Sequence, residues 1–161
     1  MKIFAFIKTY ESVIAHVLTI LGIAIVVYQL MQSNEHKRWE NYNSLNLRYY
    51  SLYSEIPTVL KSDSCKPFKF QDKKVKVWVR SYFNLYSEEY WLYLNNLIPE
   101  EMWTIRINNG VDVNLLRYPL LVRGYEYWKE QGAFVHPNDF KKLVEDKIKS
   151  LNQELKLLEC K

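Results

Sequence analysis

A run of nineteen residues without a formal charge, Val13 to Met31, constrains this chain more than any other feature. It reads VIAHVLTILGIAIVVYQLM and contains no Asp, Glu, Lys or Arg. As a helix that rises about 1.5 Å per residue, the run spans about 28 Å, close to the roughly 30 Å of a bilayer's hydrocarbon core. The run therefore predicts a transmembrane helix over residues 13–32, with a short segment (1–12) before it and a soluble domain (33–161) after it.

Two alternatives to a retained anchor fit the run less well. A cleaved signal peptide ends in small residues of the A-x-A type, whereas this run ends in the bulkier residues Tyr28 to Gln32. The core helix of a soluble protein usually carries a shorter apolar run, of about 10–14 residues. The mean hydropathy of the whole chain is negative, so the rest of it is compatible with water. We expect an uncleaved single-pass anchor.

Flanking charges give the expected orientation. Lys2 and Lys8 precede the run, whereas Lys37, Arg38 and Arg48 follow it. Since basic residues are retained on the cytoplasmic side, this small excess predicts a protein of the cell inner membrane with a cytoplasmic C-terminal domain. The chain has two cysteines and no Asn-x-Ser/Thr sequon, which agrees with a reducing compartment that does not glycosylate proteins.

Composition favours helices in the soluble domain. The chain of 161 residues has the length of about one domain. It contains 13 Tyr, 7 Phe and 5 Trp, but only 4 Gly and 5 Pro, which are too few turn residues for a sandwich or barrel of many strands. The net charge of +4 is mild and does not by itself indicate a nucleic-acid partner.

Apolar residues spaced three and four apart predict an all-α fold, with one transmembrane helix that continues into a compact domain of about five helices. A brief alternation from Lys74 to Val79 is absorbed by a helix, because two of its valines join the apolar stripe that follows. The soluble helices are expected over Glu35–Ile56, over Asp72–Asn95, from Pro99 to a stop at Asn108-Asn109-Gly110, from Pro119 to Gln131 and from Pro137 onward, with a short helical piece or turn over 111–116.

One segment carries a family resemblance. Val79 to Leu92 reads VRSYFNLYSEEYWL. Together with Leu52–Pro57 upstream and with Trp103, Pro119 and Trp128 downstream, it resembles an uncharacterised bacterial family of small single-pass membrane proteins whose helical domain carries a Y-F-N-L-x-S-E-E-x-x-L motif. The likeness covers roughly Trp39 to Phe140. It implies an anchor followed by a helical domain, and it brings no established chemistry.

A pair of acidic residues sits inside that motif. Glu88 and Glu89 are adjacent, so on a helix they point about 100° apart and cannot share one proton as a catalytic pair does. Glu89 interrupts an apolar line between Leu85 and Leu92, and we expect it to be at least partly buried. A tuned acid is the functional alternative, but a structural ion pair is the favoured interpretation. Breaking such a pair by Glu89→Gln would cost about 1–3 kcal/mol. The candidate partners are Arg106, Arg117 and Arg123.

Basic and aromatic residues are interleaved around the start of the second soluble helix. This composition suits single-stranded nucleic acid, and it suits anionic lipid equally well, at about 1 kcal/mol per well-placed Lys or Arg. A solvated loop is the favoured interpretation, lipid contact the second and nucleic acid the third. The basic–aromatic patch comprises Lys66, Lys69, Lys73, Lys74, Lys76, Trp78 and Arg80.

Five apolar residues of the last helix repeat in a 4-3-4-3 spacing typical of a coiled-coil seam. The repeat lasts about two heptads, fewer than the three or four that define a coiled coil. Packing inside the same domain is the favoured interpretation, and self-association is the alternative. The self-association seam comprises Val144, Ile148, Leu151, Leu155 and Leu158.

No catalytic, cofactor or metal constellation is recognisable in the sequence. His16 lies in the predicted span, His36 lies at its edge, and His136 precedes a proline at a helix start. The four glycines are isolated, so there is no phosphate-binding loop. We therefore expect a protein without enzymatic activity and without a cofactor.

The sequence favours a membrane-anchored accessory or regulatory subunit that binds a protein partner or forms a homo-oligomer. The alternative is an oligomeric pore-forming effector, which the scarcity of polar residues in the span disfavours. A membrane-tethered nucleic-acid-binding or hydrolytic domain is the third hypothesis.

Overall fold

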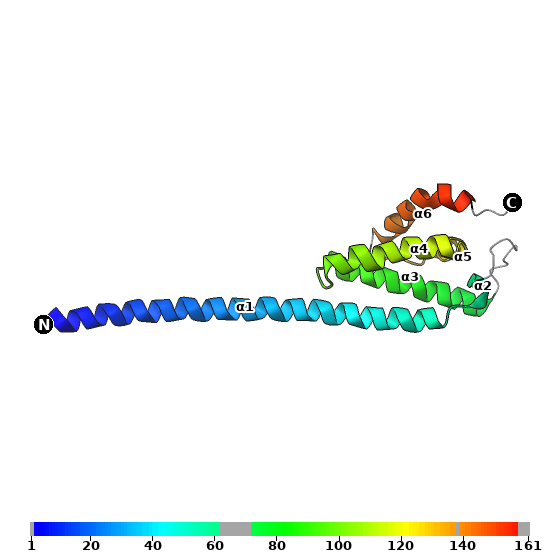
Figure 1. The fold of residues 1–161 in the computed structure, drawn as a ribbon. Coiled ribbons are helices and arrows are strands. Elements are labelled where there is room, and N and C mark those ends of the chain that lie inside the picture. The colour runs from blue at the N-terminus through cyan, green and yellow to red at the C-terminus, as the bar shows by residue number, and fades with distance from the viewer. Residues whose placement is uncertain (1, 62–71, 138, 158–161) are drawn as a thin grey trace. The chain divides into compact units, whose positions relative to one another are not determined.

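The computed structural model describes residues 2–61, 72–137 and 139–157. Within these ranges, every element of regular secondary structure is a helix. The predicted all-α fold class is confirmed. The chain separates into two compact units, Met1–Lys37 and Arg38–Lys161. The helices, shown in Figure 1, are α1 (Lys2–Ser54), α2 (Thr58–Lys61), α3 (Lys73–Leu94), the π-helix η1 (Met102–Asn108), α4 (Asn109–Arg117), α5 (Leu120–Glu130) and α6 (Phe140–Leu157).

The first unit consists of the N-terminal part of α1. Every side chain from Val13 to Met31 is exposed, including all of its Leu, Ile and Val residues. Among the described residues, α1 is the one helix long and apolar enough to cross a membrane. A stretch that exposes apolar side chains on all sides of a helix is suited to lipid rather than to water.

The predicted continuation of the apolar stretch into the first soluble helix is confirmed, because α1 runs unbroken to Ser54. No proline occurs before Pro57, and Gly22 is the only glycine of the helix. The helix ends just ahead of Pro57, whose ring disfavours a helical conformation in the residue before it. The short helix α2 then follows; it was not among the helices predicted from the sequence.

The second unit is built around α3, which returns antiparallel to residues 38–54 of α1 (Figure 1). Asp72 begins the helix as its N-cap, and its side chain accepts a hydrogen bond from the backbone N–H of Lys74 at 2.8 Å. The helix ends at the cap Asn95, so the predicted bounds hold at both ends. Its buried face packs in one core with apolar side chains of α4, α5 and α6, including Val79, Phe83, Leu115, Leu121, Tyr125, Phe140 and Val144.

The predicted stop at Asn108-Asn109-Gly110 is wrong. The chain instead forms η1 and passes directly into α4, whose second residue is Gly110. Trp103 accounts for the difference, because its buried ring stacks on Tyr93 at 4.8 Å and on Tyr86 at 5.7 Å between centroids. This packing fixes the helical path where local propensity favours a stop.

The two remaining helices follow the prediction. Pro119 is the N-cap of α5, and the helix ends at Glu130. Gly132 follows with a φ of +77°, a left-handed conformation that suits glycine after a helix C-terminus. Helix α6 begins at Phe140, three residues after Pro137.

Candidate functional site

The strongest candidate for a functional site is a cavity of about 430 Å³ inside the second unit, which we call the Glu89 cavity. Cavities of this size hold small ligands. Four elements contribute to it, namely the C-terminal part of α1, α3, η1 and α4. The wall contains Tyr42, Leu45, Asn46, Tyr49, Tyr50, Tyr82, Leu85, Tyr86, Glu89, Met102, Arg106, Ile107, Gly110, Val111 and Asn114.

Glu89 is the one acidic residue of the cavity wall, and it is buried with 6% of its surface exposed. Burial raises the pKa of its carboxyl to about 8 from the ordinary 4.5. The neighbouring charge of Glu88 raises this pKa further, while Arg48 lowers it. The carboxyl is therefore largely protonated at neutral pH.

The expected burial of Glu89 agrees with the structure, but the predicted ion pair does not. In the described part of the chain, Glu89 forms no ion pair with Arg106, Arg117 or Arg123, and all three arginines are exposed. Arg117 lies 3.5 Å from the Tyr53 hydroxyl instead. Arg106 belongs to the cavity wall without bonding to the carboxyl.

The arginine that does pair with the motif is Arg48, and its partner is the adjacent Glu88. Its guanidinium donates two hydrogen bonds of 2.7 Å, one to each oxygen of that carboxylate. Both side chains are about half exposed. Because this arginine comes from α1, forty residues before its partner, spacing within the motif could not identify it.

Tyrosine rings and two amides, those of Asn46 and Asn114, form much of the rest of the wall. Asn114, which is buried, donates hydrogen bonds of 3.1 Å to the hydroxyl oxygens of Tyr49 and Tyr82. Because both hydroxyls accept from this amide, each keeps its own O–H to offer to another acceptor. Burial raises the pKa of both tyrosines, so they stay neutral.

The π-helix η1 supplies Met102, Arg106 and Ile107 to the same wall. A π-turn inserts one residue relative to an α-helical turn, and such turns occur frequently at functional sites. Neither η1 nor the cavity was predicted from the sequence. The one sequence signal for this site was Glu89, an acidic residue within a line of apolar residues.

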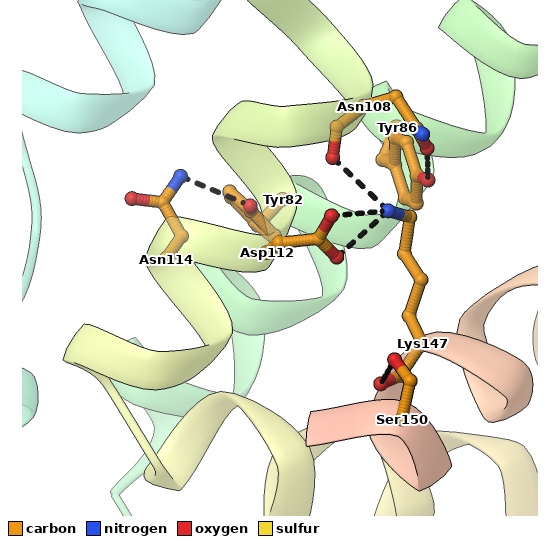
Figure 2. A network of polar contacts seen from close by, with 7 residues as sticks. All are labelled: Tyr82, Tyr86, Asn108, Asp112, Asn114, Lys147 and Ser150. Atoms are coloured by element: carbon orange, nitrogen blue, oxygen red, sulfur yellow. Dashed lines mark hydrogen bonds and ion pairs between the residues drawn. The ribbon is translucent and has the colours of Figure 1, made fainter. Parts of the chain in front are cut away.

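A second polar cluster lies on the other side of η1 and α4, around Lys147 of α6 (Figure 2). The ammonium of this lysine, which is 8% exposed, donates to both oxygens of Asp112 at 2.7 and 2.8 Å and to the backbone carbonyl of Asn108 at 3.1 Å. The Tyr86 hydroxyl donates to the Asn108 side chain at 3.0 Å. The three bonds of the Lys147 ammonium hold α6 against η1 and α4.

Part of the basic–aromatic patch packs inside the domain. Trp78 is buried and its indole N–H donates to the carbonyl of Leu52 at 2.8 Å, so it is unavailable to lipid or nucleic acid. The remaining described members have different environments. Lys76 lies over the ring of Tyr127, Arg80 lies over the ring of Trp128, and Lys73 and Lys74 are exposed. Lys66 and Lys69 lie outside the described residues.

The self-association seam is also used within the chain where the structure describes it. Val144 is fully buried, and Ile148 and Leu151 pack against the same core. Val144 is therefore not available to a second copy, whereas Ile148 and Leu151 keep part of their surface exposed. The side chain of Leu155 and the whole of Leu158 lie outside the described part.

Of the residues that the structure describes, the wall of the Glu89 cavity holds no histidine, serine or cysteine, and Glu89 is its one acidic group. Among the described residues, no group of three or more His, Cys, Asp or Glu could hold a metal ion.

Comparisons with models of known families, with curated proteins and with solved structures give no match. The family resemblance of Val79 to Leu92 therefore stays a prediction.

Proposed function

We propose that the protein is a single-pass protein of the inner membrane whose cytoplasmic helical domain acts by binding a protein partner or a second copy of the chain. The observation that carries the proposal is the fully exposed apolar stretch from Val13 to Met31, attached to a unit with a core of its own. Exposed apolar area of this extent is destabilising in water and stabilising in lipid.

The polar groups of the span support an anchor rather than a pore. The His16 ring nitrogen lies 2.6 Å from the carbonyl of Ser12, and the Thr19 hydroxyl donates to the carbonyl of Ala15 at 2.9 Å. The Thr19 hydroxyl and one ring nitrogen of His16 are therefore bonded within their own helix, which is compatible with a lipid surrounding.

Native mass spectrometry of the full chain, extracted with its surrounding lipid, tests the interaction. The proposal expects a discrete complex that contains a second copy or a partner protein. A species of 19.4 kDa alone, recovered from cells at native expression, would contradict it.

Cysteine labelling tests the orientation. In a background with Cys65→Ser and Cys160→Ser, an impermeant maleimide should leave the exposed position Glu126→Cys unlabelled in intact cells and label it after permeabilisation. Strong labelling in intact cells would place the domain on the opposite side.

A further inference from the structure

The Glu89 cavity contains a carboxyl group that lacks a counter-ion. Glu89 is buried, lies on the cavity wall and forms no ion pair with any described side chain. Buried carboxylates in proteins are paired with a cation or kept protonated. Without a cation the Glu89 carboxyl stays protonated, and a cation bound in the cavity would favour its ionised form.

The two nearest arginines do not supply that charge. Both guanidinium bonds of Arg48 go to Glu88, on the outer side of α3. Arg106 is exposed, and no bond joins it to Glu89. When Glu89 is ionised, its carboxylate is the buried charge on the cavity wall, and the charge that complements it is positive.

Tyrosine rings form walls of the kind that bind organic cations. Tyr49 and Tyr50 both line the cavity, and their rings lie 6.0 Å apart between centroids with their planes at 68°. A cation placed over such rings is attracted by their negative faces, and aromatic cages of this type recognise alkylammonium groups. On its surface the same domain already places Lys76 4.5 Å from the ring centre of Tyr127.

We infer that the Glu89 cavity binds a small organic cation with an alkylammonium group, which uses the Glu89 carboxylate as its counter-ion and the tyrosine rings as its walls. The ammonium can belong to a soluble amine or to a lipid headgroup. This binding site is independent of the proposed membrane topology and of any protein partner.

Binding is expected to be linked to proton release. At pH 7 a carboxyl with a pKa of about 8 is about 90% protonated, so a cation that binds the carboxylate displaces about 0.9 proton. Choline has no titratable ammonium, and its affinity should therefore rise about tenfold from pH 7 to pH 9. The charged groups that face Glu89 are Glu88, Arg48 and Arg106, and the wall tyrosines with a raised pKa, Tyr49, Tyr82 and Tyr86, stay neutral over this interval.

The experiment is a calorimetric titration of the full chain in phosphatidylglycerol nanodiscs, which contain no ammonium headgroup. The probes are choline and n-butylammonium, and the controls are the neutral choline isostere 3,3-dimethylbutan-1-ol and the anion butyrate. Choline titrations at pH 7 in two buffers of different ionisation enthalpy give the number of protons released. A second arm adds phosphatidylcholine to the discs, and a lower choline affinity there would identify a headgroup as the source of the cation.

The matched variants are Glu89→Gln and Glu88→Gln. Glu89→Gln should weaken choline binding at pH 9 at least tenfold and abolish both the proton release and the pH dependence. Glu88→Gln changes the exposed neighbour and should retain binding, with a smaller proton release because the charge of Glu88 raises the pKa of Glu89. A thermal melt of each variant checks folding.

A second pair of variants keeps the test valid if Glu89→Gln fails to fold. Tyr50 is exposed, so Tyr50→Ala should preserve the fold, weaken choline binding several-fold and leave the proton release unchanged, while Tyr50→Phe retains the wall. Equal binding of choline by Glu89→Gln and by the wild type would overturn the inference. So would equal affinity for the neutral isostere, or no binding of either ammonium probe at millimolar concentration.

Discussion

At the scale of single residues, the fold keeps Glu89 in the form that lacks a charge. Its side chain lies in the cavity while the adjacent Glu88 pairs with Arg48 outside, so two consecutive acids have opposite environments. The helical angle between them could be derived from the sequence. The absence of an arginine beside the buried carboxyl could not, because it depends on where three other helices place their side chains.

This arrangement changes the expected effect of Glu89→Gln on stability. The folded pKa of about 8 lies above the ordinary 4.5, so the folded state binds the proton more tightly than the unfolded state does. The stabilisation is complete below the ordinary value and is lost as pH rises through 8. Between pH 5 and pH 9 the wild type should lose on the order of 2–4 kcal/mol relative to Glu89→Gln.

Thermal melts at both pH values, without added amine, measure this difference. Glu88→Gln is the control and should also lose stability from pH 5 to pH 9, by less than the wild type because the charge of Glu88 raises the pKa of Glu89. A constant loss of stability in Glu89→Gln at both pH values would instead support the paired carboxylate that the sequence predicted.

Lys147 is the second residue whose environment decides its contribution. Lys147→Met removes the cation that Asp112 and the Asn108 carbonyl share, and it should lower the free energy of unfolding by about 1–3 kcal/mol. The control is Lys129→Met, whose 3.1 Å pair with Glu145 is largely exposed, and about 0.5 kcal/mol or less is expected there. Equal losses in thermal unfolding would show that the Lys147 cluster does not stabilise the fold.

At the scale of elements, helices whose ends carry local signals were predicted well, and the helix held by tertiary contacts was not. Asp72 and Asn95 mark both ends of α3, and Gly132 marks the end of α5. Asn108-Asn109-Gly110 is a similar signal, yet the chain continues through it because Trp103 is stacked between tyrosines of α3. The cavity beside η1 depends on that continuation, so it was beyond sequence analysis as well.

Alanine substitutions at Gly110 and Gly132 compare a glycine inside a helix with a glycine just after a helix C-terminus. Gly110 lies within α4, and a Cβ added there meets no heavy atom within 4 Å. Gly110→Ala should therefore raise the free energy of unfolding by about 0.5–1 kcal/mol. Gly132→Ala, at a φ of +77°, should lower it by about 1 kcal/mol. If both substitutions lower the melting temperature, the result would support the predicted end of a helix at Gly110.

At the scale of the whole molecule, each unit has a distinct solvent. Residues 13–31 expose apolar side chains all round, whereas the unit from Arg38 onward buries its own apolar residues in one core. A run of apolar residues without charges lies within one continuous segment, so the membrane span could be predicted from the sequence directly. The interaction surface of the domain has no such local signal. In the self-association seam, Val144 belongs to the domain's own core, and Ile148 and Leu151 pack against that core.

Alkaline carbonate extraction of membranes from cells that express the full chain tests the central claim, that residues 13–31 anchor the protein in a bilayer. The wild type should remain in the membrane pellet at its full mass. Leu21→Lys with Ile25→Lys should release it, because each lysine costs about 2.5–3.5 kcal/mol near the centre of a span. Leu47→Lys, at an exposed position of the second unit, should remain in the pellet. Recovery of the intact wild-type protein in the soluble fraction would contradict the claim.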